Sequence, residues 1–414
     1  MPITDSLRKP KEAINKLGQE PYNNQLLQKV NKEEIIMSYP QVDFLYLNEN
    51  DAIKAGVADM PKCIETMEEM LKLMKMGDFR MGGANGNSHG CMVTFPTESP
   101  FPEMPVDAPD RRFMAMPAYL GGKFDMAGMK WYGSNVENKK KGLPRSILML
   151  TLNDKDTGAP LCYMSANVLS AVRTGAIPGV GFKYFAPKET KVVGIIGPGV
   201  MSKTALAAMM AVRPMIETIK LKGRGIASIN KFIDHIHEKY PTVKEVTVVE
   251  NIEDCVRDSD IVYAATSCPS GDPMLYPYIK EDWVKKGAMI CTTAALRFDE
   301  DFIMNRARTV TDNIKLYEAW EEEYSPNAYN QIPIPAVKVM DLIAEGKMKM
   351  SDIDDLGDVL LGKIPVHRKE DEIVVYSVGG MPIEDVAWGT VVYRNALEMG
   401  IGTKLNLWQE PALA

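Results

Sequence analysis

The sequence predicts an α/β fold in two domains, and three observations lead to this prediction. The chain has 414 residues, which is more than one ordinary hydrophobic core accommodates. Its composition, 45% hydrophobic and 25% charged, is typical of a globular protein. From residue 191 onward, short apolar runs alternate with helix-like segments, which is the pattern of a parallel sheet covered by helices.

The first 185 residues have a mixed pattern. Residues 1–40 are polar, and we interpret them as a loosely attached extension or an oligomer arm. A short strand is expected near 44–47, and a helix over 59–76 because apolar residues recur there at steps of three and four. Further strands are expected around 113–119, 126–132 and 147–152, followed by a helix over 166–185.

The segment 186–325 contains the alternating strands and helices. Its first strand, 192–196, is a continuous apolar run, which is typical of a parallel strand buried on both faces. After residue 325 the pattern is mixed again, and a strand at 373–378 could rejoin the sheet of the first domain. The remaining strands of 186–325 are expected at 219–222, 246–249, 260–265 and 288–291.

A glycine-containing turn directly follows the first of these strands and opens a helix. It reads Gly197-Pro198-Gly199-Val200-Met201-Ser202, a GxGxxG pattern in which Ser202 replaces the third glycine. Gly197 permits a tight turn, and Gly199 lets the backbone approach phosphate groups at the start of the helix. An ordinary strand-to-helix turn is the alternative. The context favours a Rossmann-type dinucleotide-binding domain.

The end of the second strand bears on which dinucleotide binds. NAD-selective domains usually carry an acidic residue there, whereas this chain reads Lys222-Gly223-Arg224-Gly225. Arg224 could pair with a 2′-phosphate through two hydrogen bonds, and Lys222 could add charge. NADP(H) is therefore expected in preference to NAD(H), unless both side chains are merely solvated surface charges.

Several motifs resemble those of the ornithine cyclodeaminase/mu-crystallin family. They are Met129-Lys130-Trp131-Tyr132-Gly133-Ser134-Asn135, Gly142-Leu143-Pro144, Asp156 to Leu161, Leu169 to Ala176, Ala265-Thr266-Ser267 and Gly379 to Asp385. The resemblance covers about residues 44–405. The longer RRFMAMPAYLGG and GMKWYGSN phrases are similar to a branch of the family that is named after a tyramine oxidase subunit.

The resemblance implies a Rossmann-type NAD(P)-binding domain inserted in an α/β domain that binds substrate and forms a homodimer. Residues 186–325 would be the inserted domain, and 1–185 and 326–414 the surrounding one. The family acts on amino or imino acids with NAD(P)(H), and its lysine and helix arginine match Lys130 and Arg173. The expected cofactor-binding residues are Thr174, Gly197, Gly199, Val200, Met201, Ser202, Arg224, Thr266 and Ser267.

The residue types suit this chemistry. Lys130 lies in an apolar stretch, and an enclosed lysine can lose enough pKa to exchange a proton with an imine nitrogen near neutral pH. The alternative is a strand-end lysine that reaches solvent. Arg173 could clamp a carboxylate or hold the nicotinamide end, unless it is an exposed helix arginine.

Three further residues are weaker candidates. Arg112 could bind a substrate carboxylate. Arg145 could bind a substrate carboxylate, a cofactor phosphate or only a surface partner. His89 could help in a pocket, but we interpret it as a surface loop histidine.

The loop after the fifth strand bears on the reaction. Ornithine cyclodeaminases carry an aspartate there, whereas this chain reads Cys291-Thr292-Thr293-Ala294-Ala295. The difference favours an NADP(H)-dependent ketimine reductase or amino-acid dehydrogenase. A cyclodeaminase-type ammonia lyase that recycles NAD is the first alternative, and a non-enzymatic nucleotide-binding partner protein is the second.

Composition argues against other classes. The net charge of −7 disfavours nucleic acid and anionic membrane surfaces as partners. No apolar run approaches the ~18 residues of a membrane span, and the amino terminus has no secretory pattern, so a cytoplasmic protein is expected. The six cysteines and four histidines show no metal-ligand spacing, so no metal site is expected.

Overall fold

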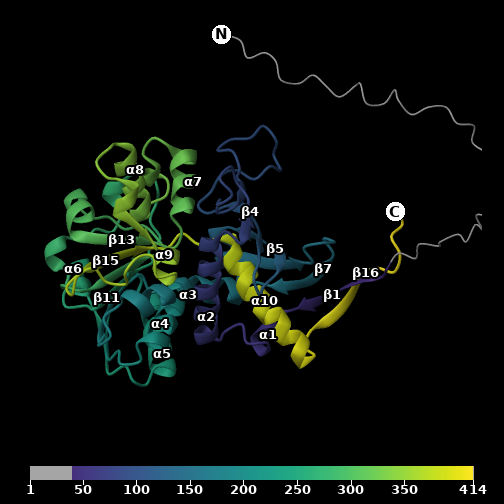
Figure 1. The fold of residues 1–414 in the computed structure, drawn as a ribbon, viewed down its shortest axis with the longest axis horizontal. Helices are drawn as coiled ribbons and strands as arrows, with labels where there is room; N and C mark the ends of the chain where they lie inside the picture. Colours follow the sequence, from purple (N-terminus) through teal and green to yellow (C-terminus); the bar gives the residue numbers. More distant parts are fainter. Residues whose placement is uncertain (1–39, 414) are drawn as a thin grey trace, which may run out of the picture. The chain divides into compact units, whose positions relative to one another are not determined.

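The computed structural model describes residues 40–413, and Gln41–Gln409 form one compact unit. The extension predicted for residues 1–40 therefore lies, apart from Pro40, outside the described residues. Two sheets organise the compact unit, with helices packed between and around them (Figure 1). This agrees with the α/β fold class.

The first sheet is mixed. Strands β1 and β7 pair in parallel, and the other pairs are antiparallel. The expected strands of this region are all present, and the sheet also takes in a strand near the carboxyl end. In spatial order it consists of β16 (Thr403–Trp408), β1 (Val42–Leu47), β7 (Pro160–Ser165), β6 (Ser146–Asn153), β5 (Met126–Ser134), β4 (Arg112–Leu120) and β2 (Phe79–Met81), with β3 (Cys91–Val93) also paired to β4.

The second sheet is entirely parallel. It confirms the five strands predicted between residues 192 and 292. The order reverses at β8, which lies between β9 and β11, and ligands of such sheets bind at this switch point. The strands in spatial order are β10 (Glu245–Val248), β9 (Thr218–Lys222), β8 (Val192–Ile196), β11 (Ile261–Ala264), β12 (Met289–Thr292), β15 (Ile373–Ser377), β13 (Ala307–Thr311) and β14 (Ile353–Asp355).

The expectation that the strand at 373–378 rejoins the first sheet is wrong. This strand, β15, pairs with β12 and β13 inside the second sheet. Its apolar residues are buried on both faces, which suits the interior of a parallel sheet. Strands from both sides of residue 325 thus share one sheet, while the division into domains at residues 185 and 325 stays a prediction.

Two long helices pack between the two sheets. In Figure 1, α2 (Met60–Met76) and α3 (Asn167–Phe185) lie between them. Glycines allow α3 to approach its neighbours: a Cβ on Gly179 would lie 2.8 Å from Ile64 of α2 and 2.9 Å from Ala208 of α4 (Val200–Val212). The buried face of α2 is the one that its apolar spacing predicted.

Helix α10 (Pro382–Met399) returns the chain from the second sheet to the first. It packs on β4, β5 and β6, and a Cβ on Gly128 of β5 would lie 3.3 Å from Val386 of α10. No helix among residues 40–413 is long and apolar enough to cross a membrane. The other α-helices are α1 (Glu49–Lys54), α5 (Ile226–Lys239), α6 (Ile252–Val256), α7 (Ile314–Tyr324), α8 (Pro335–Ala344) and α9 (Leu356–Leu360).

Candidate active site

Lys130 lies in the middle of β5, on the face of the first sheet that α10 covers. Its side chain is 2% exposed, and its Nζ lies 2.7 Å from Oδ2 of Asp385, which is fully buried. Nζ also donates to Oγ of Ser170 at 3.3 Å and lies 5.7 Å from the centre of the Tyr132 ring. The alternative of a lysine that reaches solvent is therefore wrong.

Arg173 lies on α3 and meets the same carboxylates. Its Nε donates to Oδ1 of Asp385 at 3.0 Å, and its Nη1 to Oε2 of Glu384 at 2.5 Å. Its side chain is only 5% exposed, so the alternative of an exposed helix arginine is also wrong. These contacts use the Nε–H and one Nη1–H, which leaves the second Nη1–H and both Nη2–H groups available to a bound carboxylate.

The two acidic residues stand at the start of α10. Pro382 occupies the first turn, and Glu384 accepts a hydrogen bond from the Met381 backbone N–H at 2.9 Å, which forms a capping box. Glu384 and Asp385 are both 0% exposed. Since a buried ion requires a partner, the four side chains form one mutually neutralised cluster. We call Lys130, Arg173, Glu384 and Asp385 the charge cluster.

Burial shifts the proton affinities in the charge cluster. Loss of solvent lowers the pKa of Lys130 to about 8, the charge of Arg173 adds to this, and Asp385 opposes it. Burial raises the pKa of Glu384 to about 7, against the attraction of Arg173. Lys130 can thus exchange a proton close to neutral pH, as expected of a group that serves in acid–base chemistry.

The turn before α10 is held from two other segments. Asp312, which follows β13, accepts backbone hydrogen bonds from Gly379 at 2.9 Å and Gly380 at 3.2 Å. His89 donates through Nδ1 to the Gly380 carbonyl oxygen at 2.8 Å. Because His89 is half-buried in this contact, its interpretation as a surface loop residue is wrong. Burial lowers the pKa of His89 to about 4, so it is neutral at physiological pH.

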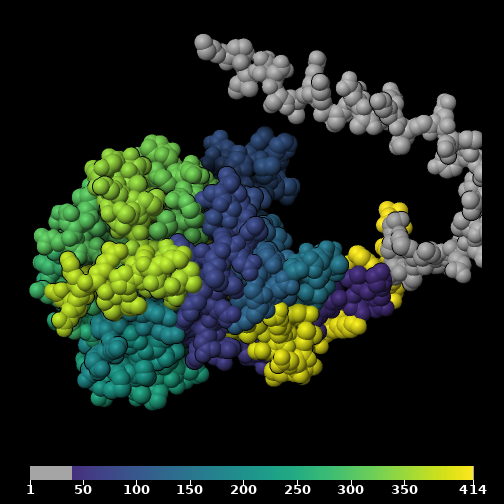
Figure 2. All heavy atoms as spheres, in the orientation of Figure 1, coloured from purple at the N-terminus to yellow at the C-terminus, as the bar shows by residue number. Residues whose placement is uncertain are grey.

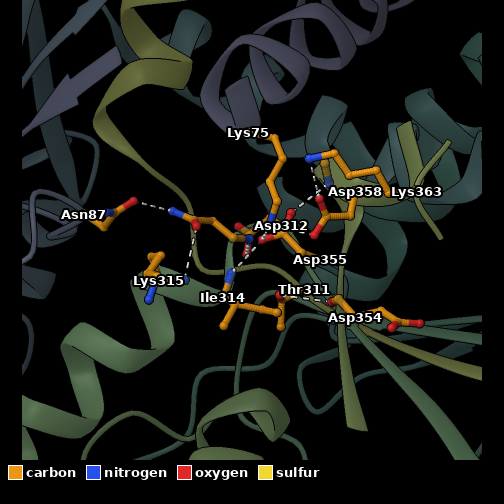
Figure 3. A network of polar contacts seen from close by, with 12 residues as sticks. Lys75, Asn87, Thr311, Asp312, Ile314, Lys315, Asp354, Asp355, Asp358 and Lys363 are labelled. Carbon is orange, nitrogen blue, oxygen red and sulfur yellow. Dashed lines mark hydrogen bonds and ion pairs between the residues drawn. The ribbon is translucent and has the colours of Figure 1, made fainter. Parts of the chain in front are cut away.

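The segment after Asp312 is also tied to its surroundings. Oδ1 of Asn87 accepts a hydrogen bond from the Asn313 side chain at 2.9 Å, and Lys75 pairs with Asp355, which accepts the backbone N–H of Ile314. Figure 3 shows Asn87 and Lys75 approaching this segment from two directions. The turn before α10 is therefore held from the end of β13 and from the loop that contains Asn87 and His89.

Arg112 shares the sheet face of Lys130. The register pairs it with Ser134, and its guanidinium lies 6.0 Å from the Tyr132 ring centre. It forms an ion pair with Asp110, which Arg145 also contacts at 3.1 Å. The Nε of Arg112 is buried and has no partner among the described residues.

A hollow of about 530 Å³ lies at this end of the sheet and is lined by Arg112, Ser134 and Asn138. Its apolar lining, Phe113, Trp131, Ile147 and Met149, belongs to the sheet face opposite Lys130. In Figure 2 the dark-blue atoms of the segment before β4 project at the top of the view. Arg145 does not line the hollow and is half exposed. Arg112 lies on the face of Lys130 and has a buried Nε without a partner among the described residues, so it is better placed than Arg145 to meet a small anion.

The glycine turn after β8 is tight on one side and open on the other. Gly197 has φ = 100°, and a Cβ there would lie 2.6 Å from the Ala265 carbonyl oxygen. A Cβ on Gly199 would meet nothing within 4 Å, so this side of the turn is open to a ligand. Ser202 is fully buried, and its hydroxyl donates to the Gly197 carbonyl oxygen at 2.5 Å. A small residue at 202 thus serves in place of the third glycine.

Groups around the turn also suit a phosphate-bearing ligand. Helix α4 begins at Val200 without a side-chain cap, which leaves the N–H groups of its first turn for an anion. The hydroxyl of Thr266, next to Gly197, is buried and has no partner among residues 40–413. The exposed Arg224 donates to the Ser267 carbonyl oxygen at 3.0 Å. The residues present therefore fit a dinucleotide.

Two other expected cofactor residues lie at the edge of this region. Met201 belongs to the first turn of α4 beside the exposed Val200. Thr174 lies on α3, where its hydroxyl donates to the Ser170 carbonyl oxygen at 2.6 Å, and the adjoining Gly175 packs against Thr204 of α4. The turn at β8 and the charge cluster are thus joined through the contact between α3 and α4.

Sequence reasoning did not single out Glu384, Asp385 or Asp312. A signal for the first two exists in Pro382-Ile383-Glu384-Asp385-Val386-Ala387-Trp388, where two adjacent acids interrupt an apolar helix start. Acids in such a helix imply buried cationic partners. The cations that pair with these acids lie more than 200 positions away in the chain, so the local sequence does not identify them.

Residues 57–400 match the family model described as the ornithine cyclodeaminase/mu-crystallin family. N-((2S)-2-amino-2-carboxyethyl)-L-glutamate dehydrogenase of Staphylococcus aureus is 26% identical over 368 residues, which are 88% of this chain and 99% of the relative. Alanine dehydrogenase of Archaeoglobus fulgidus is 29% identical over 301 residues, 71% of this chain and 84% of the relative.

A solved structure has the same fold. Delta(1)-pyrroline-2-carboxylate reductase of Thermococcus litoralis, in complex with NADH and L-proline, superposes with a TM-score of 0.69. The match covers 87% of this chain and 99% of that chain at 24% identity. At this identity the likeness concerns the fold alone.

Proposed function

The chain belongs to the ornithine cyclodeaminase/mu-crystallin family, and from this premise we propose that it is an NADP(H)-dependent ketimine reductase or amino-acid dehydrogenase. It would transfer hydride between the nicotinamide and the Cα of an imino or amino acid. The observation that carries the proposal is Lys130, a buried lysine whose pKa is lowered to about 8 on the sheet face it shares with Arg112. Curated relatives that act as dehydrogenases support it.

The glycine turn supports a nicotinamide dinucleotide as the cofactor. Gly197 and Gly199 give a backbone that can approach a pyrophosphate, and Thr266 offers a hydroxyl that needs a partner. Val200, Met201 and Ser202 would supply the N–H groups of the helix start, with Thr174 and Ser267 at the edges of the site. A bound nicotinamide supplies or accepts the hydride. Arg224 at the end of β9, with no acidic residue beside it, supports a preference for NADP(H) over NAD(H).

Lys130 would handle the proton at the substrate nitrogen. In the reducing direction its ammonium keeps the imine nitrogen protonated, which makes the imine carbon more electrophilic. In the oxidising direction its neutral amine takes a proton from the substrate ammonium. Reduction should therefore weaken as the pH rises through about 8, and oxidation should strengthen over the same range.

Arg112 would bind the substrate carboxylate. Its buried Nε lacks an acceptor among the described residues, and the register of β4 and β5 places Arg112 on the same sheet face as Lys130. Arg145 would act through Asp110, which pairs with both arginines. Arg173 would orient the same carboxylate through its Nη2, because Asp385 and Glu384 engage only its Nε and Nη1.

The apolar outer face of the first sheet supports a homodimer. Phe113 and Trp131 stack there at 5.7 Å between ring centres, and Phe113 and Ile147 are 40% and 44% exposed. Apolar side chains clustered on one face mark an interaction site more often than free surface. A second copy of this chain is the occupant that we propose.

The proposed function is tested by incubating the protein with panels of amino acids and cyclic or linear imino acids and either nicotinamide cofactor. We expect nicotinamide absorbance to change with substrate, and a Lys130→Met variant to lose turnover while nucleotides still raise its melting temperature. Ammonia release without net change of the cofactor would instead indicate a cyclodeaminase. Failure of every nucleotide to raise the melting temperature would indicate a protein that does not use this cofactor.

A further inference from the structure

We infer that Asp385 is a positioning residue, which holds the ammonium of Lys130 in place. The inference rests on the proposed function, because it concerns how Lys130 works within it. No substrate contact is required of Asp385 or Glu384.

The geometry gives Asp385 a bridging position. One carboxylate oxygen lies 2.7 Å from Nζ of Lys130, and the other accepts from Nε of Arg173 at 3.0 Å. Lys130 reaches this point from β5 and Arg173 from α3, so Asp385 joins two elements at one site. Without Asp385, two buried cations would share only the carboxylate of Glu384, and Lys130 would lose its ion pair.

The carboxylate itself has little freedom. It stands in the first turn of α10, where Pro382 and the capping box of Glu384 fix the helix start. The preceding Gly379-Gly380 turn is held by Asp312 and His89. A carboxylate fixed in this way can hold the lysine Nζ to within the small displacements that proton transfer tolerates.

The charge on Lys130 also depends on its other neighbours. From α3 it faces Arg173 and the hydroxyl of Ser170, and from its own strand the ring of Tyr132. Asp385 and Glu384 favour the ammonium form, whereas burial and Arg173 oppose it. Other titratable groups close to the charge cluster are His89, Cys63, Asp312, Arg112 and Tyr376.

The first test is Asp385→Asn, which keeps the shape and removes the charge. Because the lost carboxylate favoured the ammonium form, the pH at which Lys130 loses its proton should fall by about 1 to 3 units. When the rate of amino-acid oxidation is plotted against pH, the pH of half-maximal rate should move down by the same amount. The control is Asp354→Asn, since Asp354 is also buried and pairs with Arg308 at 2.7 Å in the second sheet. It should leave the midpoint unchanged.

The same midpoint can be read without turnover, from the carbon NMR signal of the Lys130 side chain, identified by its absence in Lys130→Arg. An unchanged midpoint in folded Asp385→Asn protein would overturn the inference. If the NMR midpoint shifts but no imino or amino acid is converted by the natural protein, the inference stands and the proposed function fails.

A second variant covers the case in which Asp385→Asn does not fold. Asp385→Glu keeps the charge but moves it by one methylene group. We expect kcat to fall about 10- to 100-fold, with the pH midpoint and the KM for the nucleotide unchanged. Turnover equal to that of the natural protein would show that the position of this carboxylate does not matter.

Discussion

Lys130 and Arg173 carry two positive charges into a part of the fold where their side chains are 2% and 5% exposed. Each would cost several kcal/mol there without a partner, so the carboxylates of Glu384 and Asp385 are a condition for their burial. At the scale of residues, the shared carboxylates give the two cations different protonation behaviour. Lys130 keeps a proton that it can exchange, whereas Arg173 stays ionised because both carboxylates outweigh the effect of its burial.

Arg224 is an exposed charge, and its proposed role depends on a ligand rather than on the fold. We expect Arg224→Asp to weaken NADP(H) binding about 100-fold, because a charge-assisted pair with the 2′-phosphate is replaced by repulsion. NAD(H) binding should change little. Calorimetric titration of both cofactors measures the difference. Lys231→Asp, an equal change of charge at an exposed position of α5, serves as the control. Equal losses for the two cofactors would contradict the 2′-phosphate assignment.

At the scale of elements, the unit formed by β8, the glycine turn and α4 combines two separate requirements. Gly197 is needed for the fold, because its φ of 100° and the nearby Ala265 carbonyl leave no room for a side chain. Gly199 has an extended backbone that any residue could adopt, and open space beside it. Its lack of a side chain is therefore relevant to a ligand and not to the fold.

The two glycines should respond differently to the same change. Gly197→Ala should destabilise the protein by about 1 to 3 kcal/mol, from backbone strain and the clash with Ala265. Gly199→Ala should leave the free energy of unfolding within about 0.5 kcal/mol of the natural value and weaken the nucleotide, because its Cβ would stand where a pyrophosphate approaches. Denaturant unfolding and nucleotide titration distinguish the two effects. Similar stability losses in both variants would argue against this separation.

At the scale of the whole compact unit, the candidate site depends on the connection between the two sheets. Strand β15 belongs to the second sheet, and after four residues the chain enters α10, which packs on the first sheet. The charge cluster therefore includes side chains from both the first sheet and the segment that leaves the second. The contacts of Asp312 and His89 with the intervening turn hold this connection in place.

Assembly belongs to the same scale. If the outer face of the first sheet binds a second copy, Ile147→Asp should reduce the mass in solution from twice 46.0 kDa to 46.0 kDa, because it buries a charge in an apolar interface. Light scattering after gel filtration measures this. Met350→Asp, at an apolar residue of similar exposure on another surface, should leave the mass unchanged. An unchanged mass for the Ile147 variant would refute this face as the interface.

The sequence alone determined the features that depend on near neighbours in the chain. Apolar runs and their period predicted the strands from 192 to 292 and the helices α2 and α3, and the glycine turn predicted the nucleotide-type unit. These are local properties, since side-chain period and glycine conformation act over a few residues. Lys130 could be proposed from its apolar surroundings together with the family motif.

Only the tertiary structure decided which sheet receives β15 and what neutralises Lys130 and Arg173. An apolar run of five residues fits the interior of either sheet, and its partners are set by packing. The carboxylate of Asp385 lies 255 positions from Lys130 and 212 from Arg173. Contacts at such separations arise when helices and sheets pack together, so the chemistry of the site follows from how the chain returns to the first sheet.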